Sequence, residues 1–590
     1  MDMWFTIISC VFFMALVGWL SYRKSKGQVS DTDGYFLAGR GLTGGFIAAS
    51  LLLTNLSAEQ LIGLNGQAYR ENLSNMAWEV TAAFAIIIMA LILLPRYLGG
   101  AFSTLPQFLS ERYDDGVRRY TVILFMLGYV LVTIPSVLYS GSVAIIQLFD
   151  VPGILGVTFE QSMWITIWVV GIIGSIYAIF GGLRAVAISD MYIGLGLVFV
   201  GLLVPAIGFY ALGDGSVLEG VKILTTENPE KLNAIGSNTD SVPFGTIFTG
   251  MILMNLFYWG TNQYVIQRTL GAKNLAEGQK GVLYSGFYKI AVPFIMMLPG
   301  LIAFHLYGEG LNPVDLAYPT LVADLMPTFL SGLFLAVLLG AVFSSFNSLL
   351  NSASTMFALD VYQVAINKNA TDAQLIRISK YFGTILALVS FFIAPLLMYA
   401  PEGLWNLIRQ FTGFFNIPII AIVLVGIMSK RIPAVGAKVA IIFHVITYYF
   451  LVWGLNHLFG IQLTVNFIYI SAILFVIEVG IMVAFGYWKP LAQPYSFKPN
   501  AKVNMMPWKF AMPVTVVLVS VVVGVYIIFS PIGLAYDGGY VSNWFWPAFV
   551  LLIVLTSIAM RFAFKSWTKK YTDFLYSKHE KKVDQDASNM

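Results

Sequence analysis

Charged residues, cysteine and histidine are all scarce in this 590-residue chain. Lys, Arg, Asp and Glu make up 11% of it and hydrophobic residues 58%, and the mean hydropathy is +0.78. This composition excludes a soluble enzyme, a nucleic-acid-binding protein and a disordered chain, and it indicates an all-α polytopic membrane protein whose surroundings are a lipid bilayer. The single cysteine, Cys10, allows no internal disulfide. The histidines lack metal-ligand spacing, so we expect neither a metal centre nor a cofactor. They are His305, His444, His457 and His579.

Long apolar stretches predict about fifteen membrane spans of roughly 20 residues or more. No small-residue cleavage site follows the first stretch, so it is predicted to be a span and not a cleaved signal peptide. The predicted limits are 3–22, 42–66, 75–99, 119–148, 159–180, 186–213, 244–269, 281–306, 321–362, 376–399, 402–429, 434–457, 464–487, 511–531 and 543–564.

Basic residues between the spans predict the orientation, because cytoplasmic loops collect Lys and Arg. Alternate connections are basic, whereas the others hold only Arg70, Lys222 and Lys231. This alternation supports an odd number of spans, with the N-terminus outside, the C-terminus in the cytoplasm and the protein in the cytoplasmic (inner) membrane. The net charge of +4 therefore concerns orientation and not a nucleic-acid partner. No obligate protein partner is expected.

Two predicted spans carry polar residues in their middle. The second is apolar up to Leu53 and polar over 54–60, and the seventh is polar within 255–263. Each unsatisfied polar group in hydrocarbon costs several kcal/mol, so such residues are buried in protein or line a wet cavity. The two spans lie five apart, and an odd separation reverses the direction across the membrane. This predicts two inverted five-span repeats with interrupted helices at a transport site. The alternative is that each span buries its polar residues against neighbouring helices.

Five strings of residues carry a family resemblance. They lie at 35–40, 55–63, 177–185, 262–268 and 344–352. They closely resemble the sodium:solute symporter family, and in particular its sodium/glucose branch, which includes bacterial sodium/galactose symporters. The resemblance implies a LeuT-type fold of ten core helices in an inverted five-helix repeat. It implies an additional span in 1–30, the transport core in 31–432, further spans in 433–564 and a charged cytoplasmic tail in 565–590.

The resemblance implies a Na⁺ site where the interrupted first core helix meets the eighth core helix. It assigns backbone carbonyls of Leu53, Leu56 and Ala341 to the ion, together with the hydroxyls of Ser344 and Ser345. Na⁺ is a hard cation that needs several oxygen ligands, and an interrupted helix frees carbonyls without adding a charge. Small hydroxyl residues also serve helix packing, which is the alternative interpretation of the two serines.

A sugar site is also implied by the resemblance. Its positions fall on Gln60, Glu79, Asn255 and Lys289, and Tyr258 matches the aromatic residue that closes the inner side. A hexose offers many hydroxyl groups, each a donor and an acceptor, and amide, carboxylate and ammonium groups together pair most of them. A purely structural ion pair between Glu79 and Lys289 is the alternative, because either charge alone is costly inside a membrane.

Three further residues match the family more weakly. Asp190 matches a carboxylate near the ion pathway, but it follows Arg184 closely and an interfacial ion pair between them is equally compatible with the sequence. Trp78 and Trp405 fall where an outer lid over the solute would lie. Aromatic residues at membrane depth also commonly face lipid.

Arg409 stands where the sugar carriers of the branch have a glutamine. Arginine favours a carboxylate or a phosphate, which it binds through two parallel hydrogen bonds. Three interpretations follow. The solute is an acidic sugar that Arg409 binds, or Arg409 pairs internally with Glu79, or the alignment shifts by one residue and Gln410 binds the sugar hydroxyls. We prefer the internal pair, because the retained Glu79 would repel an acidic solute.

The predicted function is sodium-coupled import of a small polar solute by alternating access, with a sugar as the preferred solute. Within the same fold, the alternatives are an acidic sugar, a carboxylate, an amino acid or a polyol. An alternative from a different class is a membrane sensor or channel. A sensor would need an appended signalling domain, for which the tail at 565–590 is too short. An enzyme would need a nucleophile, metal or cofactor motif, and the sequence contains none.

Overall fold

The computed structural model describes residues 3–25, 37–311, 314–399, 404–461, 463–497, 503–538 and 540–575. Within helices, the side chains of residues 3–4, 6, 18, 21–22, 24–25, 38, 53–54, 176–191, 328–329 and 404–407 are also outside the described part. The side chains of Asp190 and Trp405, for which roles are predicted, are therefore outside the described part. The side chain of Leu53 is outside it as well.

Helices make up nearly all regular structure in the described residues, with two isolated β-bridges, Leu42 to Ala272 and Asn274 to Asn504. The first half contains α1 (Met3–Ser25), α3 (Gly44–Asn55), α4 (Ala58–Arg70), α5 (Ala77–Val80), α6 (Ala82–Ile88), α7 (Leu94–Gly99), α8 (Leu105–Arg112), α9 (Asp115–Gly128), α10 (Ile134–Phe149), α11 (Val151–Leu155), α12 (Phe159–Leu212) and α13 (Val217–Thr226). The second contains α14 (Gly250–Gly260), α15 (Gln263–Leu270), α16 (Leu275–Met296), α17 (Leu298–Tyr307), α18 (Ala317–Leu325), α19 (Thr328–Met356), the π-helix η8 (Phe357–Ile366), α20 (Asp372–Ile393), α21 (Leu404–Met428), α22 (Ala434–Tyr449), α23 (Leu455–Phe459), α24 (Phe467–Trp488), α25 (Ala511–Ile528) and α26 (Phe545–Phe562).

In the described residues, 11 helical stretches are long and apolar enough to cross a membrane, and each matches a predicted span. The other predicted spans are 3–22, 42–66, 159–180 and 244–269. Spans 42–66 and 244–269 are each divided into short helices. Span 159–180 is shortened by residues whose side chains are not described, and span 3–22 contributes only a shorter apolar helix, Ile7–Val17. The total of about fifteen spans therefore stays a prediction.

Both predicted interruptions are present. Helix α3 ends at Asn55 and α4 begins at Ala58, while α14 ends at Gly260 and α15 begins at Gln263. At each break the backbone leaves helical geometry, at Leu56 (φ −77°, ψ 81°) and at Asn262 (φ −68°, ψ 118°). Polar side chains and free backbone groups are thus brought to the middle of two spans, as in transporters with interrupted helices.

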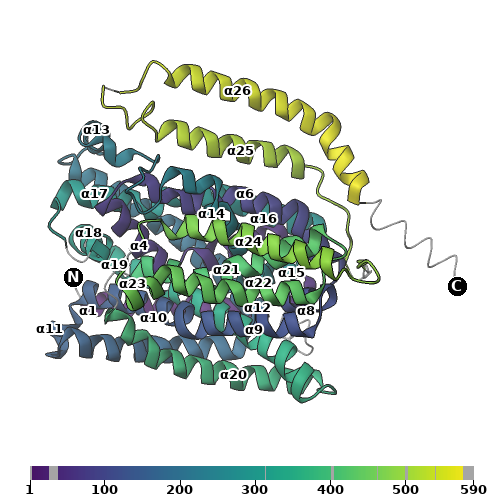
Figure 1. Cartoon of the computed structure of the whole chain (residues 1–590). Coiled ribbons are helices and arrows are strands. Elements are labelled where there is room, and N and C mark those ends of the chain that lie inside the picture. The colour runs from purple at the N-terminus through teal and green to yellow at the C-terminus, as the bar shows by residue number, and fades with distance from the viewer. Residues whose placement is uncertain are drawn as a thin grey trace.

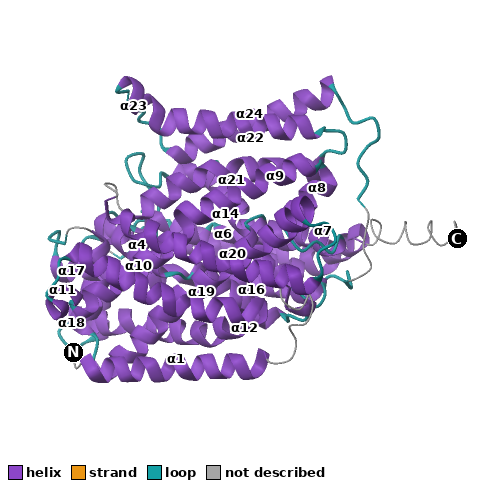
Figure 2. Cartoon of the chain, turned by 90° about the horizontal axis from the view of Figure 1, so that it is seen from below, coloured by secondary structure: helices purple, strands orange, loops and turns teal. Residues whose placement is uncertain are grey.

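The interrupted helices lie inside the bundle and other helices cover them. The span that contains α19 is 89% buried over its most apolar window, whereas that of α26 is 6% buried. In Figure 1, α25 and α26 lie side by side along one side of the bundle, with α26 outermost. Figure 2 shows α1 along one edge and α22 and α24 along the opposite edge. The central helices therefore carry the polar site, and the terminal ones surround it.

Candidate functional site

A buried ion pair connects α5 to α16 beside the first interruption. Lys289 Nζ donates hydrogen bonds to Glu79 Oε2 and to Asn55 Oδ1, and Gln60 Nε2 donates to Glu79 Oε1. The Lys289 and Glu79 side chains are 2% and 1% exposed. A charge at this depth is stable only with a partner, so the pair and its two amide neighbours form one polar unit.

Asn55 also connects the two interrupted helices to each other. It is the last residue of α3, and its Nδ2 donates to the hydroxyl of Tyr258 on α14 at 3.1 Å. Tyr258 in turn packs edge-on against Tyr264 of α15, with ring centroids 5.8 Å apart. Asn55 begins the family string at 55–63, and no role at the site was predicted for it. Its position directly before the break was the signal that it serves the site.

A small cavity of about 90 Å³ lies next to this unit. Four predicted solute residues line it, namely Gln60, Asn255, Tyr258 and Arg409, and Trp78 lines it as well. The remaining lining residues are Asn55, Ser57, Glu59, Thr133, Met254, Phe257, Asn262, Tyr264, Ile408, Thr412, Phe415 and Asn416. Amides, hydroxyls, a carboxylate and a guanidinium thus face a common space, which suits a small polar molecule.

Glu79 and Lys289 do not line the cavity, whereas Gln60 and Asn55, which are bonded to them, do. The predicted residues therefore form two groups, one facing the cavity and one supporting it. Asn255 links the cavity to α6, since its Nδ2 donates to the hydroxyl of Thr81 at 3.0 Å.

Arg409 contacts an aromatic ring. Its guanidinium carbon lies 4.4 Å from the ring centroid of Trp78, a cation–π geometry. Glu79 is bonded to Lys289 through one oxygen and to Gln60 through the other, so Lys289 supplies a cation on Glu79. The preferred pairing of Arg409 with Glu79 stays a prediction.

Gln410 does not line the cavity either, so the one-residue shift is not supported. Successive residues of an α-helix point about 100° apart, and Arg409 occupies the direction of the cavity. The backbone carbonyl of Gln410 accepts a hydrogen bond from Tyr448 of α22, at 2.9 Å.

Glu59 is a second lining residue for which no role was predicted. It is the second residue of α4, and its Oε2 is buried without a hydrogen-bond partner in the described part of the chain. The cavity therefore presents one carboxylate from α4 and one guanidinium from α21.

The predicted Na⁺ ligands lie on two helices that Arg268 of α15 holds together. Its Nε donates to Ser50 Oγ of α3 at 2.8 Å, and its Nη2 donates to Ser348 Oγ of α19. Leu53 follows Ser50 by about one helical turn, and Ser345 precedes Ser348 by about one turn. The bridge therefore fixes the register of the two helices close to the predicted ligands.

The ligand positions themselves are buried. Leu56, Ala341, Ser344 and Ser345 are each at most 2% exposed, and Ser345 Oγ has no hydrogen-bond partner among the described residues. Ser344 also borders an apolar cavity of about 740 Å³ between α1, α12 and α19. A buried hydroxyl oxygen without a partner is the type of group that a hard cation satisfies.

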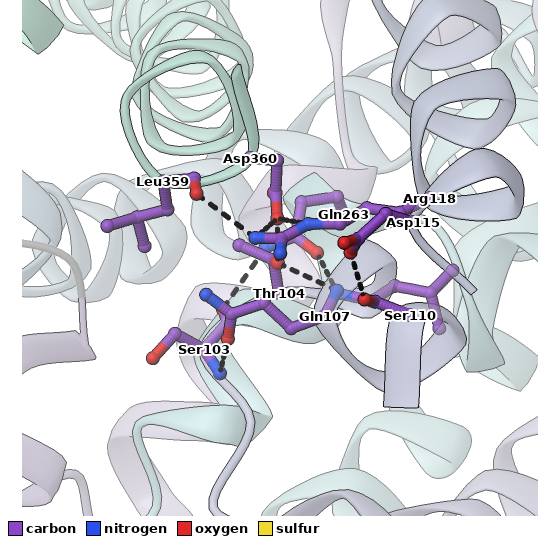
Figure 3. Close-up of polar contacts among 10 residues, drawn as sticks. Ser103, Thr104, Gln107, Ser110, Asp115, Arg118, Gln263, Leu359 and Asp360 are labelled. Atoms are coloured by element: carbon purple, nitrogen blue, oxygen red, sulfur yellow. Dashed lines mark hydrogen bonds and ion pairs between the residues drawn. The ribbon is translucent and has the colours of Figure 1, made fainter. Parts of the chain in front are cut away.

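A second polar cluster joins α15 to the start of α8, and α9 to η8 (Figure 3). Arg118 donates to Asp360 Oδ1 from Nε at 2.8 Å and from Nη2 at 2.5 Å, and Thr104 donates to the same oxygen at 3.2 Å. Gln263 Oε1 accepts the backbone amide of Leu105 at 2.9 Å. Gln263 is the first residue of α15, so the cluster fixes the second half of an interrupted helix.

The fold is that of LeuT-type transporters. A solved structure of a Na⁺-coupled sialic acid symporter, in a substrate-bound outward-open state, superposes with a TM-score of 0.71 at 19% identity, covering 84% of this chain and 99% of that one. A solved structure of Mhp1, a nucleobase-cation-symport-1 family transporter, gives 0.51 at 14% identity, covering 79% and 97%. At such identities the likeness concerns the fold alone.

The family follows from the sequence. Residues 35–443 match the model of the sodium:solute symporter family, and the chain belongs to that family. It is 43% identical over 566 residues to the uncharacterized symporter YidK of Escherichia coli, covering 96% of this chain and 97% of that protein. It is 29% identical over 468 residues to the sodium/glucose cotransporter of Vibrio parahaemolyticus, covering 74% and 82%. The protein is thus a membrane-embedded, Na⁺-coupled solute symporter and not an enzyme.

Proposed function

We propose that the transported solute is a sugar, imported across the cytoplasmic membrane together with Na⁺. The observation that carries this proposal is the polar unit of Asn55, Gln60, Glu79 and Lys289 next to a cavity lined by further amides and hydroxyls. Such groups offer both donors and acceptors, which the hydroxyl groups of a hexose require. The sodium/glucose cotransporter of Vibrio parahaemolyticus among the relatives supports the same solute class.

In this proposal Na⁺ binds where α3 is interrupted, to the carbonyls of Leu53, Leu56 and Ala341 and the hydroxyls of Ser344 and Ser345. The buried Ser345 hydroxyl and the adjacent Arg268 bridge support the assignment. Asp190 is kept as a weaker candidate for the ion pathway.

Ion binding must favour the solute-binding arrangement, because a ligand shifts an equilibrium only by its differential affinity for the two states. One Na⁺ moving down 100 mV releases about 2.3 kcal/mol. That energy supports roughly fiftyfold accumulation of a neutral solute at one ion per solute.

An anionic solute is the second candidate, and Arg409 favours it. The guanidinium lines the cavity over Trp78, and Lys289 is paired with Glu79. Against it stands Glu59, whose carboxylate also lines the cavity and would repel a negative charge unless the solute carried a cation as well. The neutral sugar therefore remains the preferred solute.

The test is uptake of radiolabelled galactose into proteoliposomes under a Na⁺ gradient, with glucose, myo-inositol, galacturonate and alanine as competitors. We expect glucose to compete strongly and galacturonate weakly. Arg409→Gln should retain uptake, and Gln410→Ala is the matched control, because it is the neighbouring residue of α21 but does not line the cavity. If only galacturonate is taken up and Arg409→Gln abolishes it, the anionic candidate replaces the neutral one. If no sugar competes or is taken up, the sugar proposal is wrong.

A further inference from the structure

A buried acid and a buried histidine meet beside Gly413 of α21, and neither of them lines the cavity. His444 of α22 and Glu478 of α24 are both 0% exposed, and His444 Nδ1 is hydrogen-bonded to Glu478 Oε1. Glu478 is the one charged residue of α24. Ionisable groups inside a membrane are costly, so their presence calls for a role. Neither residue takes part in the proposed Na⁺ or solute sites.

The hydrogen bonds of the imidazole determine how many protons the pair holds. His444 Nε2 lies 2.9 Å from the backbone oxygen of Gly413 on α21, so both ring nitrogens face an acceptor oxygen. A neutral imidazole has a single N–H donor. The arrangement therefore needs one more proton, which lies between Nδ1 and Oε1, either on the ring as imidazolium or on the carboxyl group.

Loss of that proton changes the contact with α21. The ring then keeps one proton, and the ionised Glu478 holds it at Nδ1, because a hydrogen bond to a carboxylate is stronger than one to a carbonyl. Nε2 is left with a lone pair directed at the oxygen of Gly413, and two acceptors repel each other. The bond from His444 to α21 thus exists only while the pair holds its proton.

Helix α21 depends on such external contacts near the cavity. Pro418 lies inside it and removes one internal hydrogen bond, so the helix is weakened next to Gly413. A second contact comes from Tyr448, which stacks on His444 with ring centroids 5.3 Å apart and donates to the carbonyl of Gln410. Gly413 permits this packing, because a Cβ there would lie 2.0 Å from the Tyr448 hydroxyl.

We propose that His444 and Glu478 form a proton-binding site that holds α21, and with it Arg409 and Thr412 of the cavity lining, in the position seen here. Of the other titratable groups on the surrounding helices, Tyr448 stacks on the imidazole and three more have contacts away from it. Arg409 lies over Trp78, Lys438 of α22 pairs with Asp114 at 2.6 Å, and Tyr258 of α14 is bonded to Asn55. Glu478 is the titratable group that is hydrogen-bonded to the imidazole.

The test is amide hydrogen exchange of the α21 peptides in the full chain, reconstituted in nanodiscs, at pH 6 and pH 9. Labelling times are scaled to the intrinsic exchange rate at each pH. In the wild type we expect the protection of the α21 amides to fall about tenfold at pH 9, the factor that corresponds to one lost hydrogen bond. Glu478→Gln should keep protection high at both pH values, because its amide donates to Nδ1 and leaves the proton on Nε2. His444→Leu should lower protection at both.

Two controls distinguish the proposed proton-binding site from a general loss of stability of α21. Tyr448→Phe removes the non-titrating contact with Gln410, so protection should fall at both pH values while the tenfold ratio persists. His305→Gln alters a histidine of α17 that also lies between two carbonyl oxygens, those of Leu301 and Glu227, and it should leave the wild-type profile unchanged. A pH-dependent loss in Glu478→Gln equal to that of the wild type, or a wild type without pH dependence, overturns the proposal.

Discussion

Removing one member of the Glu79–Lys289 pair should cost far more than removing both charges. Lys289→Met leaves the carboxylate of Glu79 buried with Gln60 as its remaining contact. An uncompensated charge at such depth lowers the free energy of unfolding by about 3–5 kcal/mol. The double variant Glu79→Gln/Lys289→Met has no buried charge, so most of that loss should be recovered.

The double-mutant cycle is measured as reversible unfolding in mixed micelles. We expect a coupling energy of about 2–3 kcal/mol between the two positions, at the upper end for residues in contact. Effects that simply add would refute the reasoning, because they would mean that the two charges do not stabilise each other.

Uptake by the same variants distinguishes a structural pair from a solute-binding one. If the pair only holds α5 to α16, the double variant regains transport together with stability. Because the pair also orients Asn55 and Gln60 at the cavity, the double variant should regain stability while its uptake remains reduced at least tenfold. Full recovery of uptake would assign the pair to structure alone.

Three further predictions follow from the site. Arg409→Gln and Glu79→Gln should have nearly additive effects on stability, because their partners differ; a coupling above about 1 kcal/mol would contradict the contacts described here. Ser345→Ala should raise the Na⁺ concentration for half-maximal uptake with little effect at saturating Na⁺, and an unchanged Na⁺ dependence in the Ser344→Ala/Ser345→Ala double variant would remove this ion site. A reporter fused after Met590 should be active only in the cytoplasm and a tag before Met1 reachable only from outside; finding both ends on one side would mean that the predicted span count is wrong.

The interrupted helices could be predicted from the sequence because the membrane makes polar residues conspicuous. A run such as 54–60 in the middle of an apolar stretch has few structural explanations, and the break at Leu56 falls inside it. The family resemblance implied that Gln60, Asn255 and Tyr258 belong to one site, and all three line one cavity. Glu79 and Lys289 were also assigned to this site through the family resemblance, because the pattern of polar and apolar residues does not relate them to the interrupted spans.

The partners of individual side chains could not be predicted in the same way. Whether Arg409 contacts Glu79 or Trp78 depends on how α21 is rotated about its axis relative to its neighbours. A shift of one residue along the helix changes the direction of a side chain by about 100°. His444 and Glu478 lie on different helices, and no local spacing relates them. The available signal was a histidine in the middle of the apolar span 434–457 and a single charged residue, Glu478, in the span 464–487.

The most direct test of the account is solute accumulation by proteoliposomes that contain only this protein. We predict that galactose accumulates above its external concentration under an inward Na⁺ gradient, and that the accumulated sugar leaves when the gradient is dissipated. The same experiment with a K⁺ gradient of equal size should give equilibration without accumulation. Equal accumulation with either cation would contradict coupling to Na⁺.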